Sequence, residues 1–176
     1  LIENDNLKDS NLVNLLHSLN PDIFIVIAYK IMPKEIYSIP KLGSINLHAS
    51  LLPAYKGAAP IQRAIINGEQ HTGLSTFFLN DSIDGGELIN QIKISINNED
   101  TFENVWNNLN KISPEFVINT LELIIEKQTN IIDDLTIKES FAPKILKKEL
   151  KINWNEPNYL IHNKVRAFYP FPSMYT

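Results

Sequence analysis

Two short segments with the pattern of buried strands, residues 23–28 and 44–47, constrain most strongly what this chain can fold into. The first reads Ile-Phe-Ile-Val-Ile-Ala and follows Asn20-Pro21-Asp22, which is a typical turn signal. A continuous apolar run of this length, rich in β-branched residues, predicts a strand that is covered on both faces of a sheet. The second segment predicts another buried strand, and it runs directly into polar residues.

Helical patterns alternate with these strands. We predict helices over residues 9–19 and 60–67, the latter beginning at proline because this residue is favoured in a first helical turn. Residues 33–39 are predicted to form a short helix or a turn. Two more strands are predicted over residues 73–79 and 87–96. The alternation of strands and helices predicts an α/β sheet with parallel pairs of strands.

The C-terminal half continues with helices. Residues 102–112 have apolar side chains at helical spacing, and Ser113-Pro114 is typical of an N-cap followed by proline at the first helical position. We therefore expect one helix to end near residue 112 and a second to run to about residue 127. A further helix is predicted over residues 156–168.

The composition is that of a globular protein, because 44% of the 176 residues are apolar and 20% are charged. The chain has no cysteine, which excludes disulfides and cysteine-based metal sites, and no paired spacing of other metal ligands is present. No apolar run approaches the length of a membrane span, and the first twenty residues do not resemble a signal peptide. We expect a cytoplasmic protein without a metal.

The formal net charge of −4 argues against bulk attraction to nucleic acid. Its distribution is uneven, since lysines are concentrated near the C-terminus. A solvated surface is the favoured interpretation of such a run. The lysines concerned are Lys138, Lys144, Lys147, Lys148 and Lys151.

The strand at residues 44–47 leads into a candidate catalytic site. Asn46 and His48 are two residues apart, so in a strand their side chains point to the same side of the sheet. Asp84, in the loop sequence Asp84-Gly85-Gly86, supplies a carboxylate at the end of a later strand. Ligands gather at strand ends in open α/β sheets, so we predict that these three side chains meet there.

The three residue types suit acyl or formyl transfer. An asparagine amide donates hydrogen bonds to an oxyanion, histidine donates or moves a proton, and a carboxylate orients histidine or accepts an amine proton. No side chain nearby is an activated nucleophile, which favours direct attack by a substrate amine. Each residue also has a structural interpretation: a buried histidine, a backbone-bonded asparagine and an Asp-Gly turn.

Three stretches of the sequence form a recognisable set of motifs. They are Asn46-Leu47-His48-Ala49-Ser50-Leu51-Leu52-Pro53, Tyr55-Lys56-Gly57-Ala58-Ala59-Pro60-Ile61-Gln62-Arg63-Ala64, and Thr72-Gly73 with Ile83-Asp84-Gly85-Gly86-Glu87. Together they resemble a known family, the 10-formyltetrahydrofolate-dependent formyltransferases. Within that family, residues 57–64 are similar to the branch that acts on methionyl initiator tRNA, and the similarity continues through residues 141–145, 152–154 and 166–172.

The resemblance implies an α/β fold with a partial, Rossmann-like formyltransferase sheet. It implies an N-terminally truncated catalytic domain over residues 1–133 and a lysine-rich connector over residues 134–154. The start of a truncated C-terminal β-barrel domain is expected over residues 155–176. The chain would therefore be a fragment that lacks the first strands of the family.

The resemblance also implies roles. Asn46, His48 and Asp84 would be catalytic, the four residues from Ser50 to Pro53 (Ser50, Leu51, Leu52 and Pro53) would line the folate site, and residues 23–29 would form one of its walls. The co-substrate would be 10-formyltetrahydrofolate, the acceptor would be methionyl initiator tRNA, and the protein would be a monomer. Two alternatives remain: a related enzyme that formylates a small amine, and an inactive fragment that binds folate or tRNA.

Overall fold

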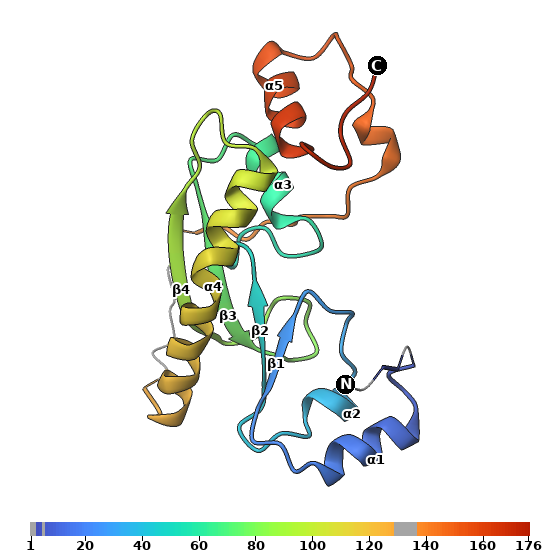
Figure 1. The fold of residues 1–176 in the computed structure, drawn as a ribbon, viewed down its shortest axis with the longest axis vertical. Helices are drawn as coiled ribbons and strands as arrows, with labels where there is room; N and C mark the ends of the chain where they lie inside the picture. The colour runs from blue at the N-terminus through green and yellow to red at the C-terminus, as the bar shows by residue number, and fades with distance from the viewer. Residues whose placement is uncertain (1–2, 5, 129–136) are drawn as a thin grey trace.

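The computed structural model describes residues 3–4, 6–128 and 137–176, which form a mixed four-stranded sheet with helices packed around it (Figure 1). The strands lie in the order β1 (Phe24–Ile27), β2 (Ser44–His48), β3 (His71–Phe78) and β4 (Leu88–Ser95). The α/β class is as predicted, but only β1 and β2 are parallel, and the other two pairs are antiparallel. The short connection at residues 79–87 returns the chain directly, whereas a parallel pair needs a long crossover.

The helices largely follow the sequence pattern, and the four shorter predicted ones are confirmed. Asp9 caps α1 by accepting a hydrogen bond from the Asn11 backbone N–H, and Pro60 occupies the first turn of α3. A 3₁₀ helix, η1 (Lys147–Leu150), precedes the last helix. The four confirmed helices are α1 (Ser10–Ser18), α2 (Lys34–Tyr37), α3 (Pro60–Ile66) and α5 (Asn158–Ala167).

The prediction of two helices around Ser113-Pro114 is wrong, because α4 (Phe102–Ile125) continues through this proline. Proline lacks the N–H that would bond to the Asn110 carbonyl oxygen in an α-helix. The Ser113 hydroxyl donates to that oxygen instead, at 3.1 Å. The side chain therefore replaces the missing backbone hydrogen bond, and the helix is not interrupted.

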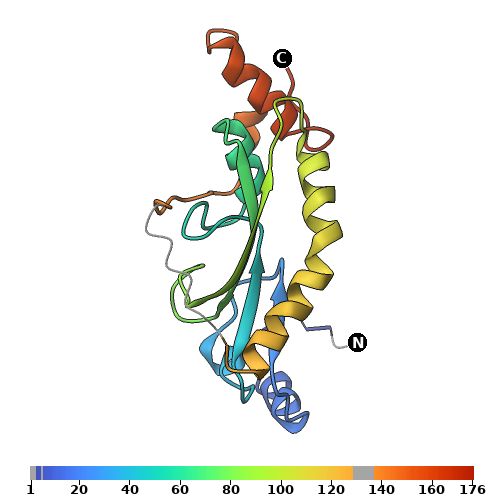
Figure 2. The ribbon, with the colours of Figure 1, turned by 90° about the vertical axis from the view of Figure 1, so that its left-hand side faces the viewer.

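The described sheet is covered unevenly. Helix α4 packs on β3 and β4, and Figure 2 shows it on one side of the sheet with residues 137–146 on the other. Strand β1 lies at one edge of the sheet, and Ile25 and Ile27 remain 42% and 54% exposed, whereas Val26 is buried. The prediction that this strand is covered on both faces is wrong, because α4 lies over the opposite edge of the sheet.

Helix α4 packs into two apolar clusters, which follow one another along its length. The larger one joins α3, β3 and the first half of α4, with Ile65, Leu74 and Val105 among its fully or nearly fully buried members. The smaller one contains Ile45 and Ile124, from β2 and the end of α4. Helix α4 therefore contributes to both clusters.

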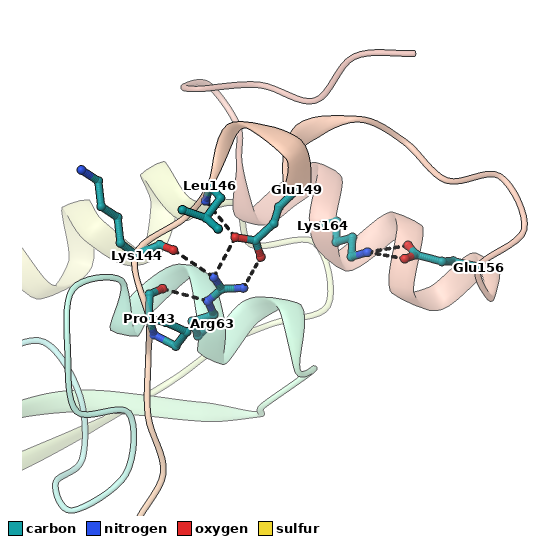
Figure 3. Close-up of polar contacts among 7 residues, drawn as sticks. All are labelled: Arg63, Pro143, Lys144, Leu146, Glu149, Glu156 and Lys164. Carbon is teal, nitrogen blue, oxygen red and sulfur yellow. Dashed lines mark hydrogen bonds and ion pairs between the residues drawn. The ribbon is translucent and has the colours of Figure 1, made fainter.

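Arg63 of α3 makes several of the polar contacts that attach the C-terminal segment (Figure 3). Arg63 of α3 donates two hydrogen bonds to the Glu149 carboxylate, at 2.7 and 3.1 Å, and further ones to the carbonyl oxygens of Pro143 and Lys144. The Arg63 hydrogen bonds are the main reason that the pKa of Glu149 lies below its ordinary value. Asn163 of α5 adds a hydrogen bond to the carbonyl oxygen of Ile66.

We expect Glu149→Gln to lower the free energy of unfolding at pH 7 by about 1 kcal/mol, since it removes a partly exposed, two-pronged ion pair. The depressed pKa means that the unfolded state binds the proton more readily. The contribution of the pair is therefore present above pH ~4.5 and is lost as the pH falls through the lower pKa of the folded state. Urea unfolding of both proteins at pH 7 and pH 3 measures this difference.

The matched control is Glu115→Gln, at an exposed position of α4. It removes the same charge away from Arg63 and should leave the unfolding free energy within ~0.5 kcal/mol. An equal loss of stability in both variants at pH 7, or a loss at pH 3 as large as the loss at pH 7, would contradict the role of the ion pair.

Candidate active site

A cavity of about 800 Å³ lies at the C-terminal ends of β1 and β2. Residues 26–32 form one wall, the loop at residues 79–84 forms another, and the start of α3 forms a third. The first half of α4 closes the cavity with mostly apolar side chains, among them Phe102, Trp106 and Leu109. Such a cavity, mainly apolar with a few polar groups, has the size and character of a site for a small organic molecule.

Asn46 and His48 line this cavity together, as their spacing on β2 predicts. Val26 pairs with Asn46 on one side and Phe77 pairs with it on the other, so the strand that carries both polar residues is fixed between two neighbours. None of the described residues hydrogen-bonds to the Asn46 amide. That amide is therefore available to a molecule in the cavity.

The ring of His48 is buried, and a hydrogen bond holds one of its two nitrogens. Its Nε2 lies 2.9 Å from the carbonyl oxygen of Tyr55, and its Nδ1 lies 3.7 Å from Asp84 Oδ2. A carbonyl oxygen only accepts hydrogen bonds, so Nε2 carries a hydrogen and donates it. Nδ1 is then the nitrogen that faces the carboxylate. Their separation is too long for a direct hydrogen bond but falls within ion-pair range.

Asp84 is held in place by the loop that carries it. Its Oδ2 accepts a hydrogen bond from the Gly57 backbone N–H at 2.8 Å, and its backbone adopts a positive φ of 47°, which aspartate tolerates better than most residues. Gly86 follows in the same loop, where an added Cβ would lie 1.6 Å from the Phe78 carbonyl oxygen. The loop thus approaches β3 so closely that only glycine fits.

The structure brings together the three residues for which we predicted catalysis, since Asn46, His48 and Asp84 all line the cavity. It does not place Ser50, Leu51, Leu52 or Pro53 among the described residues of the cavity lining. Ser50 and Leu52 are buried instead, and the Ser50 hydroxyl donates to the carbonyl oxygen of Ala54. These residues shape the loop behind the site.

The sequence did not reveal the side chains of the sheet that hold the loop at residues 50–53 in place. The Ser75 hydroxyl donates to the Ser50 carbonyl oxygen and accepts from the Leu52 N–H and from Gln91 Nε2. Ser75 and Gln91 lie on β3 and β4, where their sequence context looks like ordinary strand. Only their opposite positions in the sheet, which pair Ser75 with Gln91, reveal the network.

The remaining surface gives no sign of a metal or membrane site within the described residues. Over residues 3–4, 6–128 and 137–176, no group of three or more His, Asp or Glu side chains is placed to hold a metal ion. In the same part of the chain no helix has the length and apolar character to cross a bilayer. The five C-terminal lysines are all exposed, as expected of a solvated surface.

The comparisons with known proteins agree with this geometry. The formyl transferase family model matches residues 2–121, and the model of the formyl transferase C-terminal domain matches residues 144–176. The chain therefore belongs to the formyl transferase family. It is a homologue of curated methionyl-tRNA formyltransferases, being 45% identical to that of Thermodesulfovibrio yellowstonii and 37% identical to that of Bacteroides fragilis.

Both matches cover all of this chain but only 57% and 56% of the two relatives, so the chain spans a little over half of their length. Among solved structures, the sugar 3N-formyl transferase WlaRD is 26% identical with a TM-score of 0.70, over 87% of this chain and 57% of that one. A sugar N-formyltransferase from Shewanella sp. FDAARGOS_354, at 21% identity, reaches 0.80 over 97% and 70% of the two chains. The latter likeness shows the α/β fold alone.

We expect Gly86→Ala to lower the free energy of unfolding by at least about 2 kcal/mol, because the new Cβ would collide with backbone and the strand cannot move aside. Glu87→Ala, at the exposed neighbouring position, is the control and should stay within ~0.5 kcal/mol of the parent. Chemical denaturation measures both. A Gly86→Ala variant as stable as the parent would mean that the loop does not approach β3 in this way.

Proposed function

We propose that this chain carries the catalytic part of an enzyme that transfers a formyl group from 10-formyltetrahydrofolate to the α-amine of methionine on initiator tRNA. The observation that carries the proposal is the convergence of the Asn46 amide with the His48–Asp84 pair at one cavity. The 45% identity to a curated methionyl-tRNA formyltransferase over the whole chain supports this choice of substrate.

The reaction requires one bond exchange and one proton transfer. The amine nitrogen bonds to the formyl carbon, the bond from that carbon to the folate nitrogen breaks, and a proton passes from the amine to that nitrogen. Asn46 donates a hydrogen bond to the formyl oxygen as negative charge develops on it. When Nδ1 of His48 also carries a hydrogen, His48 donates a second hydrogen bond to the formyl oxygen. Asp84 stabilises the charged ring and helps to accept the amine proton.

The cavity suits a folate. Its volume of about 800 Å³ is within the range of small-molecule sites, and apolar groups such as Val26, Ile27 and Ile31 offer a wall to a flat ring system. The Aquifex aeolicus HypX structure, which shares the fold at 17% identity and a TM-score of 0.75, was determined with tetrahydrofolic acid. We assign the wall at residues 26–32 as a surface that contacts the folate. The contact of Ser50, Leu51, Leu52 and Pro53 with the folate stays a prediction.

The domain boundaries follow from the same proposal. We assign residues 1–133 to the catalytic domain, residues 134–154 to the connector and residues 155–176 to the start of a C-terminal β-barrel domain that contacts tRNA. The match of residues 144–176 to the C-terminal domain of the family supports the last assignment. The exposed lysines of the connector would add a salt-dependent attraction to the tRNA phosphates. We expect a cytoplasmic, monomeric enzyme.

A small-amine formyltransferase is the second candidate, because WlaRD and several other structural relatives act on sugars. The two candidates are distinguished by an acceptor competition assay on the full-length protein, with charged initiator tRNA against an amino sugar nucleotide. We expect a kcat/KM for charged tRNA that exceeds that for the small amine by at least about a thousandfold. A preference for the small amine would overturn the proposed acceptor.

We expect Asp84→Asn to lower kcat by about a hundredfold or more, since it removes the carboxylate charge beside His48. The amide oxygen still accepts the Gly57 N–H, so the melting temperature should change little. His48→Ala should lower kcat at least as strongly. Single-turnover formylation by the full-length variants measures the loss, and near-normal turnover in either variant would remove that residue from the mechanism.

We expect Asn46→Ala to raise the barrier to formyl transfer by about 3 kcal/mol, the usual cost of removing one oxyanion donor. The loss should appear in kcat at unchanged stability, because none of the described residues hydrogen-bonds to this amide. Asn119→Ala, at an exposed position on α4, is the matched control and should retain full activity. A fall in melting temperature with normal turnover would instead make Asn46 a structural residue.

A further inference from the structure

One short loop contacts both ionisable groups of the site. The Tyr55 carbonyl oxygen accepts from His48 Nε2, and the Gly57 N–H donates to Asp84 Oδ2. The loop adopts an unusual backbone shape, with a positive φ of 61° at Tyr55, which is costly for an aromatic residue. Such a conformation persists only where the surroundings hold it, so the groups that hold this loop also determine the geometry of the site.

Residues 139–142 lie along this loop, although they are far from it in the sequence. Ser140 makes three of the connecting hydrogen bonds. Its N–H donates to the Pro53 carbonyl oxygen at 3.3 Å, its Oγ accepts from the Tyr55 N–H at 3.0 Å, and its carbonyl oxygen accepts from the Lys56 N–H at 2.9 Å. Ala142 extends the pairing, since its N–H donates to the Lys56 carbonyl oxygen and its carbonyl accepts from Ala59.

The bond from the Lys56 N–H to the Ser140 carbonyl oxygen holds the same peptide unit whose oxygen accepts from His48. The Tyr55 carbonyl and the Lys56 N–H belong to one planar peptide unit and point in opposite directions. Ser140 binds the N–H at one edge of this plane, and His48 donates to the oxygen at the other edge. The hydroxyl of Ser140 fixes the preceding peptide through the Tyr55 N–H. The orientation of the acceptor that holds the His48 ring therefore depends on Ser140 on both sides of Tyr55.

The side chain of Tyr55 contributes a separate anchor. Its hydroxyl donates to Glu69 Oε1 at 2.6 Å and accepts from Asn67 Nδ2 at 3.0 Å. Burial, reinforced by the hydrogen bond to Glu69, raises the pKa of Tyr55 well above its ordinary value, so the hydroxyl remains a donor. Lys56 completes the attachment through an ion pair with Glu139 at 2.7 Å.

We infer that Ser140 is a positioning residue for the reaction proposed above: through the loop at residues 53–57 it sets the orientation of the His48 ring against Asp84. The inference rests on the proposed function for its kinetic consequence, but its structural consequence is measured independently of activity. Ser140 touches neither His48 nor the cavity lining among the described residues, so its effect is transmitted through the peptide between Tyr55 and Lys56.

The test compares Ser140→Ala, which removes the acceptor of the Tyr55 N–H, with Ser140→Thr, which keeps it. Ser18→Ala is the matched control, because that hydroxyl bonds only within α1 among the described residues. Each substitution is made in the full-length protein. The ¹⁵N and ¹H resonances of the His48 imidazole are recorded below the melting temperature, together with kcat and KM for formyl transfer.

We expect Ser140→Ala to lower kcat by about tenfold to a hundredfold, the cost of slightly misplacing a catalytic group, with both KM values within about twofold. The Nε2–H resonance of His48 should shift or broaden, because its acceptor moves. Ser140→Thr should restore kcat and the resonance, and Ser18→Ala should leave both unchanged. A change in KM alone, or a lower melting temperature with a normal kcat, would overturn the inference.

Glu139→Gln serves as the second test if Ser140→Ala does not fold. It weakens the attachment of residues 139–142 to the loop at residues 53–57 through an exposed carboxylate, without removing a buried acceptor. It should shift the same His48 resonance by a smaller amount. If the parent protein does not transfer formyl groups, the proposed function fails, while the imidazole resonances still test the positioning role. An unchanged His48 spectrum in every folded variant would overturn that role.

Discussion

The hydrogen bond from the buried His48 ring to the Tyr55 carbonyl oxygen is the interaction on which the site depends. It determines which ring nitrogen carries a hydrogen and therefore which one faces Asp84. The same loop then supplies the Gly57 N–H to the carboxylate, so the two groups share one support. Because one loop with an unusual backbone shape provides both contacts, the geometry of the His48–Asp84 pair depends on the few peptide units from Tyr55 to Gly57.

Most elements of the fold could be predicted from local patterns, because their signals are local in origin. Pro60 marks the start of a helix through its own fixed φ, and apolar residues at helical spacing mark the helix at residues 9–19. The error at Pro114 has the opposite cause: the signal for a break was real, but the hydroxyl of Ser113 compensates for it. The antiparallel pairing and the uncovered β1 depend on how the whole sheet is assembled, which no local pattern contains.

The candidate site also has a part that could be predicted from the sequence and a part that could not. The side chains at Asn46 and His48 could be predicted from strand periodicity, and Asp84 from its position in a glycine-rich loop. The groups that hold them are mostly backbone N–H and C=O, which every residue possesses and which leave no trace in a sequence. Ser140 is the extreme case, because its contacts join segments about 85 residues apart.

The uninterrupted course of α4 has a mechanical consequence. At about 1.5 Å per residue, the helix extends for roughly 27 Å between Trp106 at the cavity and Ile124 in the smaller apolar cluster. A substitution that loosens the packing around Ile45 and Ile124 therefore acts on the same continuous helix that forms a wall of the pocket, although neither residue lines that pocket.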